Sequence, residues 1–139
     1  MNYTGTARSN YVKLKDFDGL VNALEPFPIS IEKRVDGTVC LLSQDSGGWP
    51  SEPWDGGEDE DEDGGRPSEY FDPLTHLCPF LEDGQVIVLM EVGNEGYRYL
   101  VGAATAYTWD GRHISISIDQ IYEQAESLFS VSGITHAEY

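Results

Sequence analysis

Basic side chains are scarce in this sequence. Of its 139 residues, 8 are Lys or Arg and 25 are Asp or Glu, so the formal net charge is −17 at pH 7. A domain that binds DNA or RNA directly normally carries a basic surface. An anionic membrane surface likewise attracts basic segments. The shortage of Lys and Arg therefore argues against direct binding of nucleic acid and against attachment to a membrane surface.

Cysteine, histidine and long apolar runs are also few. Cys40 and Cys78 show neither a CxxC pair nor a zinc-type spacing, so we expect both to be small buried hydrophobic residues. His76, His113 and His136 are too far apart in sequence to suggest a metal site. No run approaches the roughly 18 apolar residues of a membrane span, and the first residues lack the apolar segment of a signal peptide. We therefore expect a cytoplasmic protein with no metal and no cofactor.

Motifs that carry catalysis are missing as well. The sequence has no GxSxG, P-loop or GxGxxG pattern. Gly93-Asn94-Glu95-Gly96 has the composition of a turn, not of a phosphate-binding loop. No nucleophile and base stand in a recognisable spacing, so we predict that the protein is not an enzyme and has no catalytic residues.

The length and the aromatic content predict one folded domain over 1–139. The sequence is 40% apolar, with 3 Trp, 8 Tyr and 5 Phe, whereas a disordered acidic chain would have few aromatic residues. Alternating apolar residues predict strands at 10–15, 29–35 and 113–118, and an apolar run predicts a buried strand at 85–92. The segments 38–42 and 97–107, each of which follows a turn, are expected to be strands as well. Apolar spacings of three and four predict helices at 17–24, 68–81 and 121–128, capped by Asp16, Ser68 and Asp119.

The order of these elements predicts the fold class. Asp36-Gly37 and Asp110-Gly111 indicate hairpins, and strands that follow one another as hairpins form antiparallel sheets. We therefore expect an α+β fold with an antiparallel sheet of about five or six strands and two or three helices mainly on one face. Residues 1–9 and 131–139 are expected to be a loose N-terminus and a loose tail, and 44–67 a long loop.

The predicted loop at 44–67 is the strongest local signal. It contains three Pro, two Trp and six Gly, and its acidic residues include an unbroken run of six. Alternate side chains of an extended segment project to one side about 7 Å apart. That spacing is similar to the gap between neighbouring phosphates of a nucleic acid strand. The candidate partner-binding carboxylates are Glu52, Asp55, Glu58, Asp59, Glu60, Asp61, Glu62 and Asp63.

Two other interpretations of this loop stay open. A charge run is often simply solvated and keeps a protein soluble. The loop also resembles part of a calcium site, because Asp59, Asp61, Asp63 and Gly64 fit the first six positions of an EF-hand loop. The twelfth position, which needs Glu, is Tyr70, so an EF-hand is rejected and weak divalent-cation binding is the remaining form of this idea.

Trp49 and Trp54 lie in the same loop, beside Pro50 and Pro53. Tryptophan is enriched at the centres of protein interfaces, so both are candidate partner-binding residues. The alternative is that they fold back and cover the core. An interaction module that relied on aromatic contacts would use Trp49, Trp54 and Trp109.

Two segments, Ser9-Asn10-Tyr11-Val12-Lys13-Leu14-Lys15-Asp16 and Glu91-Val92-Gly93-x-Glu95-x-x-Arg98-Tyr99-Leu100-Val101-Gly102, resemble small acidic proteins carried by phages, plasmids and other mobile elements. The resemblance covers about half of the chain and rests on strand starts and turns. In charge, the chain is similar to anti-restriction and anti-CRISPR proteins that mimic DNA.

The resemblance and the acidity together imply an inhibitor in a bacterial host. It would occupy the positive groove of a host nucleic-acid-binding protein, such as a nuclease or a CRISPR effector, and would act as a monomer or a homodimer. The alternatives are an acidic interaction or assembly module without mimicry and a divalent-cation-binding module.

Overall fold

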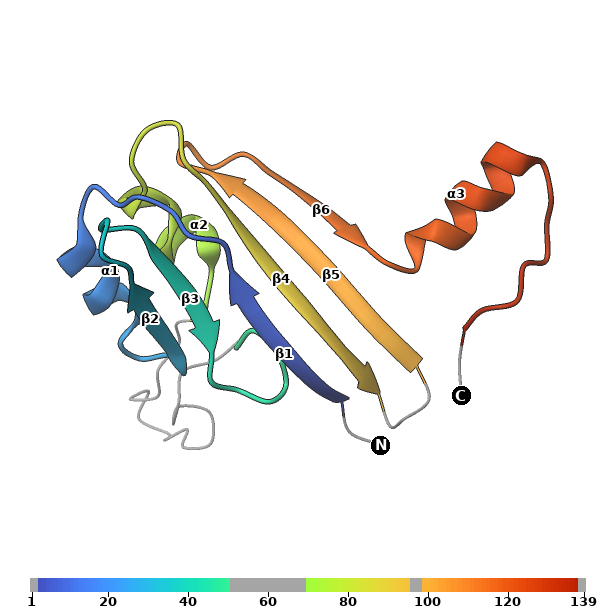
Figure 1. The fold of residues 1–139 in the computed structure, drawn as a ribbon, viewed down its shortest axis with the longest axis horizontal. Coiled ribbons are helices and arrows are strands. Elements are labelled where there is room, and N and C mark those ends of the chain that lie inside the picture. Colours follow the sequence, from blue (N-terminus) through green and yellow to red (C-terminus); the bar gives the residue numbers. More distant parts are fainter. Residues whose placement is uncertain (1–2, 51–69, 96–98, 138–139) are drawn as a thin grey trace, which may run out of the picture.

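A computed structural model describes residues 3–50, 70–95 and 99–137, and it confirms the α+β class. One antiparallel sheet has the strand order β2-β3-β1-β4-β5-β6 (Figure 1). The elements are β1 (Tyr3–Ser9), α1 (Phe17–Leu24), β2 (Ile29–Lys33), β3 (Val39–Ser43), α2 (Pro73–His76), the 3-10 helix η2 (Cys78–Phe80), β4 (Val86–Glu95), β5 (Tyr99–Thr108), β6 (His113–Ser117) and α3 (Gln120–Phe129). None of the helices in the described ranges has the length and apolar character needed to cross a membrane.

The N-terminal strand corrects the sequence analysis. Residues 3–9 were expected to be loose, but they form β1, which lies inside the sheet between β3 and β4. The predicted strand at 10–15 makes only isolated bridges, from Val12 to Val39 and from Leu14 to Leu81. The Thr, Gly, Ala and Ser residues of β1 give no alternating apolar pattern. A strand that pairs on both sides is held by backbone hydrogen bonds whatever its side chains are, and β1 contributes the buried Ala7 to the sheet.

Both Asp-Gly hairpins form, with three-residue loops. The amide of Gly37 donates to the Arg34 carbonyl, and Gly37 has a positive φ of 91°. Gly111 repeats this arrangement, with its amide on the Thr108 carbonyl and a φ of 93°. Each loop is a turn followed by a left-handed residue, which is the second common way to close a hairpin.

The helix predicted at 68–81 is divided and shorter. Ser68 lies outside the described residues. Asp72 caps α2 instead, by accepting a hydrogen bond from the Leu74 amide at 3.2 Å. Pro73 occupies the first helical position, where its missing N–H costs nothing, and after one turn the chain tightens into η2 around Pro79. Helix α1 matches its prediction, with Asp16 accepting from the Gly19 amide at 2.9 Å.

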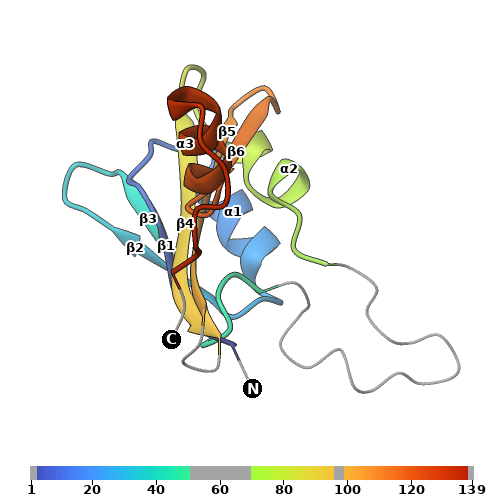
Figure 2. The ribbon, with the colours of Figure 1, turned by 90° about the vertical axis from the view of Figure 1, so that its right-hand side faces the viewer.

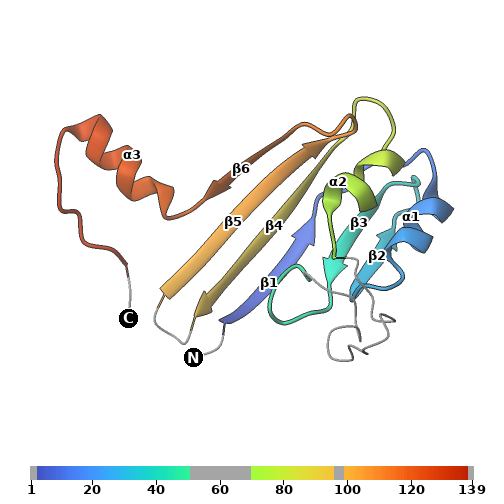
Figure 3. The same cartoon turned by 180° about the vertical axis from the view of Figure 1, so that it is seen from behind.

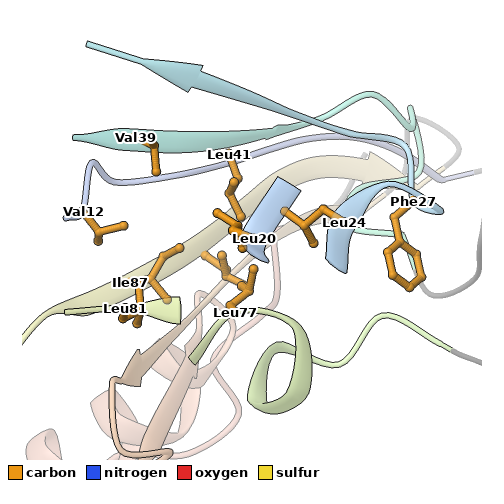
Figure 4. Close-up of a cluster of buried hydrophobic side chains, with 10 residues drawn as sticks. Val12, Leu20, Leu24, Phe27, Val39, Leu41, Leu77, Leu81 and Ile87 are labelled. Atoms are coloured by element: carbon orange, nitrogen blue, oxygen red, sulfur yellow. The ribbon is translucent and has the colours of Figure 1, made fainter. Parts of the chain in front are cut away.

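The core lies between one face of the sheet and the helices α1 and α2 (Figure 4). Strands β3 and β4, helix α1 and the segment 77–81 all contribute apolar side chains to it: Val39, Leu41, Ile87, Leu89, Leu20, Leu24, Leu77 and Leu81. Phe27, which follows α1, is also buried. Cys40 and Cys78 are buried free cysteines, as predicted.

None of the helices that the structure describes lies over the opposite face of the sheet. Figures 2 and 3 show α1 and α2 together on one side of the sheet. Helix α3 lies beyond β6 and covers neither face, and none of its residues is buried. The prediction of helices mainly on one face is therefore confirmed for α1 and α2, while α3 stands apart from the core.

Candidate protein-binding site

Most of the predicted site residues lie outside the described ranges. Glu52, Trp54, Asp55 and the run 58–63 all fall in the segment 51–69. Of the ten candidates, the structure describes Trp49. It also describes the residues that flank this segment, so the site is built here from the two points where the acidic segment joins the fold.

The two ends of the acidic segment meet on the helix-covered side of the sheet. The rings of Trp49 and Phe71 stack, with centroids 6.3 Å apart and planes 25° from parallel. Phe71 in turn contacts Phe27 edge-on at 5.5 Å and stacks on His76 at 6.0 Å. Because Phe27 is buried and Trp49 and Phe71 pack against the core, the described residues on either side of 51–69 lie together at one position on the fold.

Trp49 is held through its backbone as well as its ring. Its amide donates a hydrogen bond to Oε1 of Glu91 on β4 at 3.0 Å. The preceding residue, Gly48, has a φ of +100°, and its carbonyl accepts from the Ser43 hydroxyl at 2.6 Å. A side chain at residue 48 would meet the Glu91 carboxylate, so glycine is required here by conformation and by space.

Helix α2 fixes the other end of the segment. Both carboxylate oxygens of Asp72 accept hydrogen bonds, Oδ1 from the Leu74 amide and Oδ2 from the Thr75 hydroxyl at 3.0 Å. The Asp72 amide donates to Nδ1 of the buried His76 at 2.8 Å. The residue next to Phe71 is therefore tied to α2 through backbone and side chain, which sets the position of the aromatic pair.

The stacked pair Trp49 and Phe71 is called here the aromatic base. An open groove of about 310 Å³ lies between the aromatic base and the sheet. Its walls are Trp49, Pro50, Phe71 and Pro73 on one side and Leu89, Glu91, Ala103, Thr105 and Tyr107 of β4 and β5 on the other. Burial raises the pKa of the Tyr107 hydroxyl above its usual value of 10, and the nearby charge of Asp72 adds to this. The Trp49 indole Nε1 is buried with no hydrogen-bond partner among the described residues.

The side chains that line the groove are mainly apolar and aromatic, with the Glu91 carboxylate among them. Cys78 is buried, and burial followed by the charges of Asp72 and Asp110 raises the pKa of its thiol, which makes it a poor nucleophile. The described part of the chain holds no group of three or more His, Cys, Asp or Glu placed to hold a metal ion. What the groove and its rim present is aromatic and apolar side chains beside a carboxylate.

Positive charge gathers at the far end of the fold from β6. The Arg34 guanidinium lies 3.7 Å from the centroid of the Tyr11 ring, and Arg8 lies 5.7 Å from the same ring. Lys33 lies over Phe17 at 4.5 Å. Between described residues the one ion pair joins Arg112 and Asp110 at 3.1 Å. Few carboxylates of the described surface are thus neutralised by a neighbouring cation.

No protein-family model, curated protein or solved structure matched this chain.

The sequence analysis missed most of this base. Phe71 was expected on the core face of the helix predicted at 68–81; it does pack against the core, but it lies before α2. Glu91 was noted as part of the resemblance segment, and neither Glu91 nor Gly48 was proposed as a site residue. The signal present in the sequence is the pair Gly47-Gly48 directly before Trp49, since adjacent glycines next to a large aromatic residue indicate a close backbone approach. Nothing in the sequence indicates that the backbone at Gly48 lies against the carboxylate of residue 91, about forty positions later.

Proposed function

We propose that this protein is a stoichiometric inhibitor that binds a nucleic-acid-binding protein of a bacterial host through its acidic segment. The carboxylates of residues 52–63 would lie in the target's basic groove in place of phosphates, as in DNA-mimic anti-restriction and anti-CRISPR proteins. The proposal includes no catalytic step.

The observation that carries the proposal is the contact between Trp49 and Phe71, the aromatic base. The segment 51–69 holds nine of the 25 acidic residues, namely Glu52, Asp55, the run 58–63 and Glu69. The Trp49–Phe71 stack brings the two ends of that segment together on the core. A chain segment held at both ends loses less conformational freedom on binding than a free tail does, and a smaller ordering cost leaves more of the contact energy as affinity.

The charge balance of the whole chain supports the same conclusion. A net charge of −17 on a chain of this length attracts a basic surface over a distance and speeds encounter. Such attraction is screened by salt, with a Debye length of about 10 Å at 0.1 M ionic strength. Binding of the target should therefore weaken steeply as salt is raised and should be competed by DNA.

The test uses two variants with the same change in net charge. One replaces Asp59, Asp61 and Asp63 by Asn. The other, as control, replaces Glu32 by Gln, Asp83 by Asn and Glu123 by Gln, three exposed carboxylates that form no hydrogen bond or ion pair with another described residue. Wild-type protein immobilised on a resin is exposed to a host lysate and eluted with a salt gradient, and the captured protein is then titrated against each variant.

The proposal expects capture of a nuclease, a CRISPR effector or another DNA-binding protein that DNA competes away. It expects the 59/61/63 variant to bind about tenfold more weakly, since three exposed charge pairs contribute about 0.5 kcal/mol each, and the control to bind nearly as the wild type does. If both variants lose the same amount of affinity for the captured protein, the loss reflects only the change in net charge. A target that DNA does not displace would overturn mimicry.

The alternative of a module that binds through tryptophans is less favoured by the described residues. Trp49 and Trp109 are both partly buried and pack against the core, so neither presents its full ring to a partner. The divalent-cation alternative predicts a melting temperature that rises with added Ca²⁺. A rise abolished by the 59/61/63 variant would favour it over mimicry.

A further inference from the structure

The sheet face turned away from α1 and α2 is apolar where β4, β5 and β6 form it. Met90 pairs with Ala104, and Ala104 pairs with Ile116, so alternate residues of the three strands share this face. Its exposed large side chains, called here the open face, are Val86, Met90, Val92, Leu100, Ile114, Ile116 and Ile118. Ile114 and Ile116 are 69% and 62% exposed. Isolated exposed apolar residues are ordinary, but a continuous sheet face of them indicates an interaction surface.

The open face is also free of charge. The remaining residues that β4, β5 and β6 direct to this side are Val88, Asn94, Gly102, Ala104, Ala106 and Thr108. None of them is acidic, in a chain that carries 25 acidic residues. Two copies of a chain with a charge of −17 repel each other over most of their surfaces. The open face is where they can meet without bringing carboxylates together.

A second apolar surface, which no described residue outside the arm covers, lies on the C-terminal arm, residues 119–137. Ile121, Ala125 and Leu128 follow the spacing of one side of a helix, with Phe129 beside them. Leu128 is 77% exposed and Phe129 is 65% exposed. An isolated ten-residue helix is marginal in water, and its stability in a protein comes from packing its apolar side. Helix α3 therefore needs a surface that the described part of its own chain does not provide in this conformation.

Hydrogen bonds direct the arm away from its own sheet. The Ile118 amide donates to the Gly102 carbonyl at 2.9 Å, so β6 stays paired up to the start of the arm. The Ser117 amide then donates to Oε1 of Gln120 at 2.7 Å, and the Ser117 hydroxyl donates to Oδ1 of Asp119 at 2.7 Å. Asp119 is thus engaged with Ser117 and makes no side-chain cap bond to α3.

Contacts between α3 and the residues that follow it hold the C-terminal arm together. The amides of Gly133 and Ile134 donate to Oε2 of Glu126 at 3.1 and 3.3 Å. The rings of Tyr122 and His136 stack with centroids 3.9 Å apart. The tail is thereby fixed to α3, although it has no helix or strand of its own. The arm extends from the edge of the sheet as one piece (Figure 1).

We propose that two copies of this chain form a symmetric dimer in which the arm of each copy covers the open face of the other. The two surfaces are apolar and lie on the same chain, so one two-fold axis covers both open faces and both arms at once. From the exposed fractions of their large apolar side chains, the two surfaces together expose on the order of 1,000 Å² per chain, against the roughly 800 Å² per partner that a stable interface buries. The occupant of the open face is thus a second copy of the chain.

Oligomeric state against concentration tests the proposal, by sedimentation or light scattering. Ile116→Glu on the open face and Leu128→Glu on the arm should each weaken the dimer at least tenfold. Val35→Glu is the matched control, because Val35 is fully exposed in the β2–β3 loop, away from both surfaces. All three substitutions add one negative charge at an exposed site. Circular dichroism should show the same folded content in each, which separates loss of the interface from loss of the fold.

Disulfide trapping identifies whose arm covers the face. In one sample, a chain with Met90→Cys is mixed with a chain with Leu128→Cys and oxidised. In a second sample, one chain carries both substitutions and is oxidised alone. The native cysteines are buried and do not interfere. The proposal expects a disulfide between the two single variants. A monomer at every concentration, a dimer indifferent to Ile116→Glu and Leu128→Glu, or a double variant that forms only a disulfide within one chain would each overturn it.

Discussion

Gly48 provides the sharpest test of the aromatic base. Its φ of +100° lies in the left-handed region, and a methyl group added there would clash with the Glu91 carboxylate. That carboxylate accepts the hydrogen bond from the Trp49 amide. In Gly48→Ala the carboxylate has to move, so the substitution adds backbone strain and removes the bond that places Trp49.

The magnitude follows from two separate costs. A left-handed residue other than glycine costs about 1–2 kcal/mol. Loss of a hydrogen bond to a charged group costs about 1.5–3 kcal/mol. We therefore expect Gly48→Ala to lower the free energy of unfolding by about 3–4 kcal/mol. Gly37→Ala is the matched control, because Gly37 has a similar φ of +91° with nothing within 4 Å of the added methyl group. It should cost about 1–2 kcal/mol, the strain alone.

Urea unfolding followed by tryptophan fluorescence measures both variants. The difference of about 2 kcal/mol between them isolates the Glu91 contact, and the Trp49 signal should change in the native baseline of Gly48→Ala only. Equal destabilisation by Gly48→Ala and Gly37→Ala would refute the reasoning, since it would mean that Glu91 does not hold the backbone at Trp49.

Three further predictions concern the core and two titratable groups. Leu41→Ala should cost about 3–4 kcal/mol in urea unfolding, because Leu41 is fully buried between sheet and helices; a loss below about 1 kcal/mol would contradict that placement. In a Cys40→Ala background, Cys78 should react with a disulfide reagent much more slowly in native than in unfolded protein at pH 8, because burial raises the pKa of its thiol and leaves little thiolate; equal rates would contradict it. The Thr108 hydroxyl, and then Arg112, lower the pKa of Asp110 below its usual value of 3.8. The stability that the ionised Asp110 contributes is therefore present above pH 3.8 and is lost as pH falls through the lowered pKa. Asp110→Asn should reduce this acid sensitivity, and an NMR titration that shows an unshifted Asp110 carboxyl would refute the prediction.

The elements with strong periodicity were predictable from sequence, and those fixed by neighbours were not. The spacing of Leu20 and Leu24 and the Asp16 cap predicted α1, because both signals are local. Strand β1 was missed, because Gly5 and Ala7 belong to it through pairing with residues 91–93, which is a long-range effect. The alternation of Ile114 and Ile116 correctly predicted one face of β6. It did not predict that the face is exposed, because periodicity shows which side chains point to the same face and not whether another element packs on that face.

The site shows the same division. Composition alone singled out the acidic segment and its tryptophans. The groups that fix its ends, Phe71 and Glu91, become neighbours of Trp49 only through the fold. Local chemistry predicted the two Asp-Gly hairpins, but the loop length depended on hydrogen bonds across the strands, such as that from the Arg34 amide to the Thr38 carbonyl.

The acidic segment and the open face respond to salt in opposite directions, which allows each proposal to be judged by itself. Binding of a basic target draws on attraction between opposite charges, so raising salt weakens it. The proposed dimer brings together two chains of charge −17 through uncharged surfaces. Salt screens their repulsion and leaves the apolar contact in place, so the dimer should tighten as salt is raised from about 0.05 to 0.5 M. A dimer that dissociates over that range would be held by charges and not by the arm and the open face. Such a dimer could place acidic side chains of one copy on the Arg8 and Arg34 cluster of the other.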